Sequence, residues 1–180
     1  MDEMHCVENE HVSYGSNAAF EPGTYVGFTG YIHCGGIEAY VEDACFRLVP
    51  PAQQPLCLNV SMLWECGTWI NGDCTGCIWY NGTWLDGRFE AGMWYGGTWH
   101  NGIFNVSSWK GGTWRNGVFS CSFFNDGIWW DGTFRNSHWE NGMWRGGVWE
   151  NGSVLAESGS VTHLDSDSWG SMCLKRGWSS

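Results

Sequence analysis

Cysteine is the most reactive side chain in this sequence, with nine copies in 180 residues. Two residues separate Cys74 from Cys77, which is the spacing of many redox-active dithiols and of half of many zinc sites. Cys57 and Cys66 lie upstream, but the eight and seven residues between successive cysteines match no zinc motif. We therefore expect no metal site, and we favour a disulfide or thiol pair between Cys74 and Cys77.

The six histidines are scattered along the chain, without HxH or HExxH spacing. We expect His100 and His138 to be solvated surface residues. No Ser-His-Asp order, phosphate-binding loop or dinucleotide-binding fingerprint occurs. The sequence therefore offers no catalytic residue and no cofactor site, and it predicts a protein that is not an enzyme.

A five-residue repeat must position these side chains. Every fifth residue from Trp64 to Trp149 is aromatic in seventeen of eighteen cases, and Cys74 is the exception. We name this the central position. A small position lies three residues after each central position, and so two residues before the next one. From residue 67 to residue 152 it holds Gly in fourteen of eighteen cases, and otherwise Cys77, Ser107, Ser122 or Ser137. The preceding turn position is Asn, Asp or Gly in fourteen of eighteen. Such a register without insertion indicates a solenoid, because a slip would turn the buried aromatics outward.

The repeat length indicates a closed coil. Asn-Gly, Asp-Gly and Gly-Gly pairs mark tight turns, so about three residues of extended chain separate successive corners. Four such sides would give a square coil of twenty residues, stacked on the next at about 4.8 Å. The central and small residues would then point inward and their neighbours outward. We expect Trp64, Trp84, Phe104, Phe124 and Trp144 to form one internal column.

This Gly-x-Trp-x-Asn pattern resembles the pentapeptide-repeat family over residues 64–152. The resemblance implies a right-handed square β-helix with a large central residue inside. The family usually has Leu or Phe at the centre and Ala at the small position, whereas this chain has Trp and Gly. A smaller Gly leaves room for the larger ring, so the exchange compensates in volume. Similar Gly-Trp pentads recur in phage-encoded proteins.

An open sheet of short β-hairpins with Asn-Gly type I′ turns is the alternative fold. Such a sheet would leave a wall of Trp side chains exposed on one face. We therefore favour the closed all-β coil.

The flanking segments lack the repeat. Residues 1–62 form a predicted β-rich N-terminal module, residues 63–152 the solenoid, and residues 153–180 a cap or tail. Strands are expected in the module at Tyr25–Cys34, Ile37–Val49 and Leu56–Leu63. A short strand at Val154–Leu155 or Val161–Leu164 is expected to cover the last coil, because the end of a solenoid needs a cap.

The distribution of charge limits the possible partners. The net charge is −11, of which residues 1–62 hold −7 and the repeat only −3. Acidic pentapeptide-repeat proteins resemble B-DNA and bind gyrase. That role needs a dense acidic face on the solenoid, which the nearly balanced charges of this repeat do not provide. The absence of a basic stripe argues against nucleic-acid binding.

The N-terminus begins Met1-Asp2-Glu3 and has no signal-peptide pattern, and no stretch is apolar enough to span a membrane. Nine cysteines and fifteen tryptophans suit a rigid particle exposed to an oxidising exterior, which virion components reach by lysis. Since nine is odd, at least one thiol is free or pairs between chains in such a compartment, and Cys6, Cys121 and Cys173 are the candidates.

Outward positions suggest a contact surface. In a coil of twenty residues, residues that differ by multiples of twenty lie on the same side. One side would then carry an apolar ridge that consists of Leu63, Ile103, Phe123 and Met143, together with Thr83. Exposed ridges of this kind mark protein contacts. The outward aromatics Tyr80, Tyr95 and Trp130 would fall on three different sides, which argues against sugar binding.

These observations predict a non-enzymatic structural protein of a phage particle, as a decoration, tail, neck or fibre component that acts as a rigid spacer or contact surface. The expected partners are other structural proteins of the virion in a homo-oligomeric or symmetric assembly, without nucleic acid or membrane. The alternatives are an adhesin or glycan-binding module, an acidic DNA mimic that binds a topoisomerase, and a cytoplasmic location.

Overall fold

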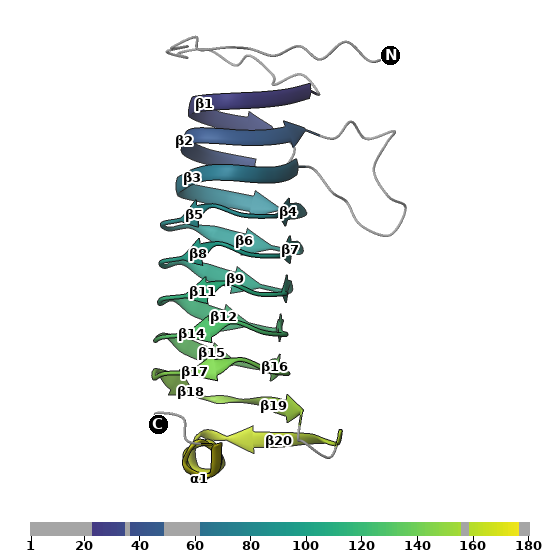
Figure 1. Ribbon diagram of the computed structural model, residues 1–180, viewed down its shortest axis with the longest axis vertical. Coiled ribbons are helices and arrows are strands. Elements are labelled where there is room, and N and C mark those ends of the chain that lie inside the picture. Colours follow the sequence, from purple (N-terminus) through teal and green to yellow (C-terminus); the bar gives the residue numbers. More distant parts are fainter. Residues whose placement is uncertain (1–22, 35–36, 49–61, 156–158, 177–180) are drawn as a thin grey trace.

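Figure 1 shows the computed structural model as a long stack of coils, with β1 and β2 at one end and β20 and α1 at the other. The structure describes residues 23–34, 37–48, 62–155 and 159–176. The chain is mostly strand, and its parallel coils form a β-solenoid of about six turns. The predicted all-β solenoid is therefore confirmed.

The coil has three sides and fifteen residues, not four sides and twenty. Trp64 pairs in parallel with Trp79, Trp69 with Trp84, and Cys74 with Phe89. The square coil predicted from the repeat is wrong, and the alternative of antiparallel hairpins is also wrong, because the strands of successive coils run parallel. Three rings per coil are enough to fill the lumen, since rings from different sides already touch edge to face.

Three columns of strands make up the sides of the solenoid. The first coil is the long strand β3 (Met62–Thr75). The first side continues with β4 (Cys77–Trp79), β7 (Met93–Trp94), β10 (Ser108–Trp109), β13 (Phe123–Phe124), β16 (Ser137–Trp139) and β19 (Asn151–Leu155). The second side holds β5 (Thr83–Trp84), β8 (Thr98–Trp99), β11 (Thr113–Trp114), β14 (Ile128–Trp129) and β17 (Met143–Trp144). The third side holds β6 (Arg88–Glu90), β9 (Ile103–Asn105), β12 (Val118–Ser120), β15 (Thr133–Arg135) and β18 (Val148–Trp149).

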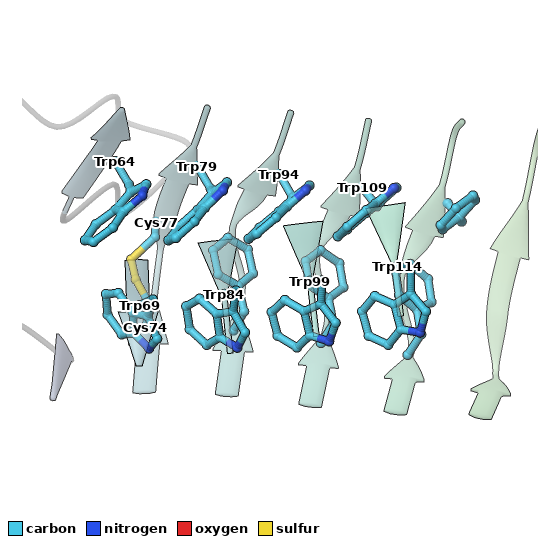
Figure 2. Packing of buried hydrophobic residues seen from close by; sticks show 14 of the residues in the cluster. Trp64, Trp69, Cys74, Cys77, Trp79, Trp84, Trp94, Trp99, Trp109 and Trp114 are labelled. Atoms are coloured by element: carbon cyan, nitrogen blue, oxygen red, sulfur yellow. A yellow bond between two sulfur atoms is a disulfide. The ribbon is translucent and has the colours of Figure 1, made fainter. Parts of the chain in front are cut away.

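The core consists of three internal columns of stacked rings, two of which Figure 2 shows side by side. Trp64 and Trp79 stack with ring centroids 4.7 Å apart and an interplanar angle of 8°, and Trp84 and Trp99 stack at 4.9 Å and 7°. This separation matches the spacing of neighbouring strands, so each complete coil after the first, in which Cys74 replaces one ring, adds a ring to all three columns. Rings of different columns meet edge to face, as Trp94 does with Trp99 at 5.8 Å. Both contact geometries are favourable for aromatic pairs.

The three corners of each coil are of two kinds. At the corners after the first and second sides, a Gly at the small position takes a positive φ, for example 100° at Gly97. A Cβ there would clash with the carbonyl oxygen of Gly82 in the preceding coil. At the corner after the third side, the turn residue itself is left-handed, as at Val106 (φ 49°) and Cys121 (φ 50°). The residue that follows this turn does not have a positive φ, so a residue other than Gly, such as Ser107, can take this position.

A buried serine ladder uses that freedom. The Ser122 hydroxyl accepts a hydrogen bond from the backbone N–H of Ser107 at 3.1 Å and donates to the carbonyl of Ser120 at 2.7 Å. The Ser137 hydroxyl in turn accepts from the N–H of Ser122 at 3.1 Å. Each serine therefore joins two coils, and it satisfies an N–H group that would be costly to bury without a partner.

The N-terminal strands close one end of the solenoid. β1 (Gly23–Cys34) and β2 (Ile37–Leu48) form an antiparallel hairpin, and β2 pairs antiparallel with β3. Both strands match the sequence prediction. Residues 56–61 of the third predicted segment lie outside the described residues. Phe46 stacks on Trp64 with an interplanar angle of 4°, so the core is continuous across residue 62.

The C-terminal residues cover the other end. β19 pairs antiparallel with β20 (Val161–Asp165), and α1 (Ser166–Arg176) follows, so strands form at both positions proposed for a cap. Trp169 of α1 is buried against the last coil. The Trp149 indole N–H donates to the carbonyl of Leu164 at 3.0 Å. The helix was not predicted from the sequence.

Candidate functional site

The structure joins Cys74 of β3 and Cys77 of β4 in a disulfide inside the solenoid, at the corner where the first coil leads into the second (Figure 2). Cys74 occupies a central position and Cys77 a small position, and both are almost completely buried. Their Cα atoms are 6.1 Å apart, which is within the usual range for a disulfide. Because reductants cannot reach buried sulfur atoms, we interpret this bond as a structural crosslink and not as a redox site.

The apolar ridge predicted from the sequence does not exist as a single surface. Leu63 and Phe123 lie on the first side, Met143 on the second and Ile103 on the third. The reason is the fifteen-residue coil, in which a step of twenty residues moves to the next side. Ile103, Phe123 and Met143 are exposed, and whether any of them contacts a partner stays a prediction.

Two outward tyrosines align where the sequence analysis had separated them. Tyr80 and Tyr95 lie on successive coils of the first side and stack with ring centroids 5.4 Å apart and an interplanar angle of 17°. Both rings are close to half exposed. The side chains of Ile78 in β4 and Met93 in β7 point outward beside them. We name Tyr80, Tyr95, Ile78 and Met93 the tyrosine patch. The patch is largely apolar and spans the second and third coils.

A second outward column lies on the second side. The Arg115 guanidinium lies 5.9 Å and the Arg145 guanidinium 5.6 Å from the centre of the Trp130 ring. Trp130 is exposed, and each arginine is one coil away from it. Arg115 and Arg145 thus contact the Trp130 ring from the two neighbouring coils, and this cation–π attraction holds the three long side chains together on the surface.

A groove of about 830 Å³ lies near the C-terminal end of the first side. Phe123 and His138 form its aromatic wall, with ring centroids 5.9 Å apart and an interplanar angle of 62°. The Phe123 ring is 56% exposed. His138 Nδ1 lies 2.9 Å from Ser153 Oγ and is half-buried. His138 is therefore a surface residue that is only partly solvated, because the next coil supplies a hydrogen-bonding partner, whereas His100 is exposed as expected.

Strand β20 supplies further residues that line this groove. His163 lies opposite Ser153 and Asp165 opposite Asn151 in the antiparallel pair. Hydrogen bonds from the Ser168 hydroxyl and N–H lower the pKa of Asp165, which stays ionised at neutral pH. The groove thus combines an exposed ring with amide, hydroxyl, imidazole and carboxylate groups. Such a mixture suits a polar ligand that has one apolar face.

The described residues do not assemble a metal site. No group of three or more His, Cys, Asp or Glu side chains in this part of the chain is arranged to hold a metal ion. His138, His163 and Asp165 line the same groove, but they are not grouped closely enough to hold a metal ion. Within the described residues, no helix is long and apolar enough to cross a membrane.

The candidate intermolecular cysteines differ in their placement. Cys121 is exposed at a left-handed corner on the rim of the groove, where its thiol can be reached by another chain. Cys6 lies outside the described residues. Cys173 lies in α1, but its side chain lies outside the described part. A link through any of the three stays a prediction.

The structure also brings together two cysteines that the sequence analysis did not pair. Cys45 of β2 lies directly opposite Cys66 of β3. Burial and a hydrogen bond with Cys45 raise the pKa of the Cys66 thiol to about 11. The sequence carried one signal of this pair, because Cys66 occupies a turn position where Asn, Asp or Gly is usual.

Comparisons with known proteins give no relative for this chain: no protein family, curated protein or solved structure matches it.

Proposed function

We propose that this protein is a non-enzymatic structural component of a phage particle, in which the solenoid acts as a rigid spacer between other structural proteins. The observation that carries the proposal is the unbroken core. It runs from the N-terminal hairpin, where Phe46 stacks on Trp64, to the C-terminal helix, where Trp169 packs on the last coil.

The physics of this core supports a mechanical role. Bending the rod would open ring stacks on one side and compress them on the other, and close-packed interiors resist both changes. Each coil also hydrogen-bonds to the next on all three sides, as in the bond from the Tyr80 N–H to the Trp64 carbonyl at 2.8 Å. The stiffness is thus distributed along the whole rod.

Both ends of the solenoid are covered, which supports a spacer whose aromatic core is closed at each end. The hairpin β1–β2 lies on the first coil, and β20 with α1 lies on the last (Figure 1). Without these covers, the rings of the first and last coils would be exposed to water, whereas Phe46 and Trp169 bury them. The buried disulfide suits a particle that functions in an oxidising exterior.

Fractionation of native particles tests this proposal. The chain would be tagged in its own genome, and particles released by lysis would be separated on a density gradient. We expect the tag to sediment with intact particles at a fixed ratio to their main structural protein. A tag that stays in the soluble host fraction would refute the structural role.

A glycan-binding module is the second candidate, and the aligned aromatics favour it. Tyr80 stacks with Tyr95, and Phe123 opens into the groove with polar groups around it. Stacking on exposed rings is a common way to bind the apolar face of a sugar. A glycan array with the full-length chain tests this function: saturable binding that Phe123→Ala or Tyr80→Ala removes would support it, and an unlabelled array would exclude it for the glycans tested.

A further inference from the structure

Two cysteine side chains face each other at the junction between the N-terminal hairpin and the solenoid. Cys45 of β2 and Cys66 of β3 are direct partners in an antiparallel pair. Such partners have Cα atoms about 4.5–5.5 Å apart, which lies inside the range that a disulfide spans. Ala44 and Phe46 are buried on either side of Cys45, so its side chain faces outward, as the exposed Cys66 does.

The backbone holds this pair in place. β2 has one extra residue between its pairing with Thr68 and its pairing with Cys66, and Asp43 in this bulge has a φ of 47°. The bulge bends β2 around the same corner that Cys66 and Gly67 form in the first coil. A Cβ on Gly67 would clash with the Asp43 carbonyl oxygen, so the two strands are in close contact next to the cysteines.

The two sulfur atoms interact already as thiols. Burial and a hydrogen bond with Cys45 raise the pKa of Cys66 to about 11, which keeps its thiol protonated at neutral pH. Cys66 is exposed and Cys45 is partly buried, so a small oxidant can reach the pair. Cys121, which is also free, lies several coils away from this pair.

We propose that Cys45 and Cys66 are an oxidation site that forms a second disulfide, which locks the N-terminal hairpin onto the first coil of the solenoid. The oxidant is a small-molecule disulfide such as oxidised glutathione. One cysteine thiolate attacks a sulfur atom of glutathione disulfide, and one glutathione thiolate leaves. The second cysteine loses its proton and attacks the mixed disulfide, which releases the second glutathione. Two protein thiols are oxidised, and one glutathione disulfide is reduced to two thiols.

This crosslink does what the Cys74–Cys77 bond cannot. The buried bond joins residues three positions apart at one corner of the solenoid, whereas a bond from Cys45 to Cys66 joins β2 to β3. That junction is where antiparallel pairing changes to the parallel pairing of the solenoid. A disulfide at this junction keeps the hairpin β1–β2 attached to the first coil once the protein leaves a reducing compartment.

Peptide mapping of the full-length protein tests the proposal. The protein would be prepared in reduced form, incubated with oxidised glutathione, alkylated and digested with chymotrypsin without reduction. Cleavage after aromatic residues places Cys45 alone in peptide 41–46 and Cys66 alone in peptide 65–69. We expect these two peptides to appear linked in most molecules, and to appear faster as the pH rises, because Cys66 must be deprotonated.

Variants separate this site from general oxidation. Cys45→Ser should abolish the linked peptide, whereas the matched control Cys121→Ser should keep it. Oxidation should raise the melting temperature by about 5 °C or more in the wild type and in Cys121→Ser, and leave Cys45→Ser unchanged. Recovery of both peptides in alkylated form after oxidation, or of Cys66 linked mainly to another cysteine, would overturn the proposal. The peptide map of the wild type decides this even if the variant fails to fold.

Discussion

The indole rings of Trp149 and Trp169 stack face to face, with centroids 3.9 Å apart and an interplanar angle of 9°. Trp149 belongs to the last coil and Trp169 to α1, so the helix adds one more ring to the third internal column. Trp169 also meets Trp144 edge to face at 5.0 Å. A residue outside the repeat thus closes the core in the same way that a further coil would.

Trp169→Ala should remove this cap. Loss of a buried indole costs about 3–5 kcal/mol, and about 6–20 °C in melting temperature follows for a domain of this size. Differential scanning calorimetry measures the change. Trp169→Phe, which keeps a stacked ring, should lose less than half as much, and an unchanged melt for Trp169→Ala would show that the helix does not cap the solenoid.

Gly97→Val should be strongly destabilising, and Thr98→Ser should be nearly neutral. Gly97 has a φ of 100°, and its Cβ would clash with the Gly82 carbonyl, so strain and steric overlap add to about 3 kcal/mol or more. Thr98 points outward, where such exchanges stay within about 0.5 kcal/mol. Chemical denaturation of both variants checks this difference. Equal midpoints would contradict the assignment of the two positions to the inside and outside of the coil.

Ser122→Ala should break the serine ladder. The exchange leaves the buried N–H of Ser107 without its acceptor and costs about 1–3 kcal/mol. Ser108→Ala is the matched control, because Ser108 has an outward, half-buried side chain one residue after the ladder. Amide hydrogen exchange at Ser107 reports the effect directly: it should accelerate in Ser122→Ala and not in Ser108→Ala. No acceleration would mean that the ladder does not restrain this corner.

Acid should loosen the start of α1. Hydrogen bonds from the Ser168 hydroxyl and N–H lower the pKa of Asp165 in the folded protein. A lowered folded pKa means that the stabilisation is present above the unfolded pKa and is lost as the pH falls through the folded pKa. We expect the Ser168 amide signal in NMR spectra to shift and broaden on acidification in the wild type. In Asp165→Asn the same signal should be independent of pH in this range, and a pH response that persists there would have another origin.

Much of this fold could be predicted from the sequence because the repeat fixes which side chains face inward. The central aromatics, the small residues beside them and the tight turns follow from the five-residue period alone. The number of sides does not, because the period is the same for three sides and for four. That choice depends on how rings pack across the lumen, as Trp94 and Trp99 do at 5.8 Å.

A signal for three sides was nevertheless present in the sequence. The four small positions without Gly are Cys77, Ser107, Ser122 and Ser137, and they differ by multiples of fifteen. They mark the corner after the third side, where the turn residue and not the small residue has the positive φ. Four of the five central phenylalanines, which are Phe89, Phe104, Phe119 and Phe134, share the same interval. The positions that depart from the repeat consensus therefore indicate a coil of fifteen residues.

The candidate surfaces could not be predicted without that coil length. The step of twenty residues placed Tyr80 and Tyr95 on different sides and grouped Phe123 with Met143, and both assignments were wrong. The partners of His138 and of Cys45 come from neighbouring strands whose register the repeat does not reveal. The helix α1 was missed because its sequence is rich in serine and only the fit of Trp169 on the last coil shows its role.

One coil of fifteen residues can be deleted so that the sequence at the new junction is the same as in the natural chain. Deletion of residues 97–111 joins Gly96 to Gly112-Thr113-Trp114, and the natural chain reads Gly-Gly-Thr-Trp at both places. This variant should fold with a melting temperature close to that of the wild type. Deletion of the twenty residues 97–116 instead moves third-side residues onto the second side and misplaces the serine corners, so it should be far less stable.

The spacer role is tested most directly by cryo-electron microscopy of particles that carry the wild-type chain or the variant lacking residues 97–111. We predict that both chains are incorporated and that the two structures attached at the ends of the solenoid lie about 4.8 Å closer in the variant, which is the spacing of one coil. An unchanged separation, or particles in which neither chain is present, would contradict the proposal that the solenoid sets a distance within the particle.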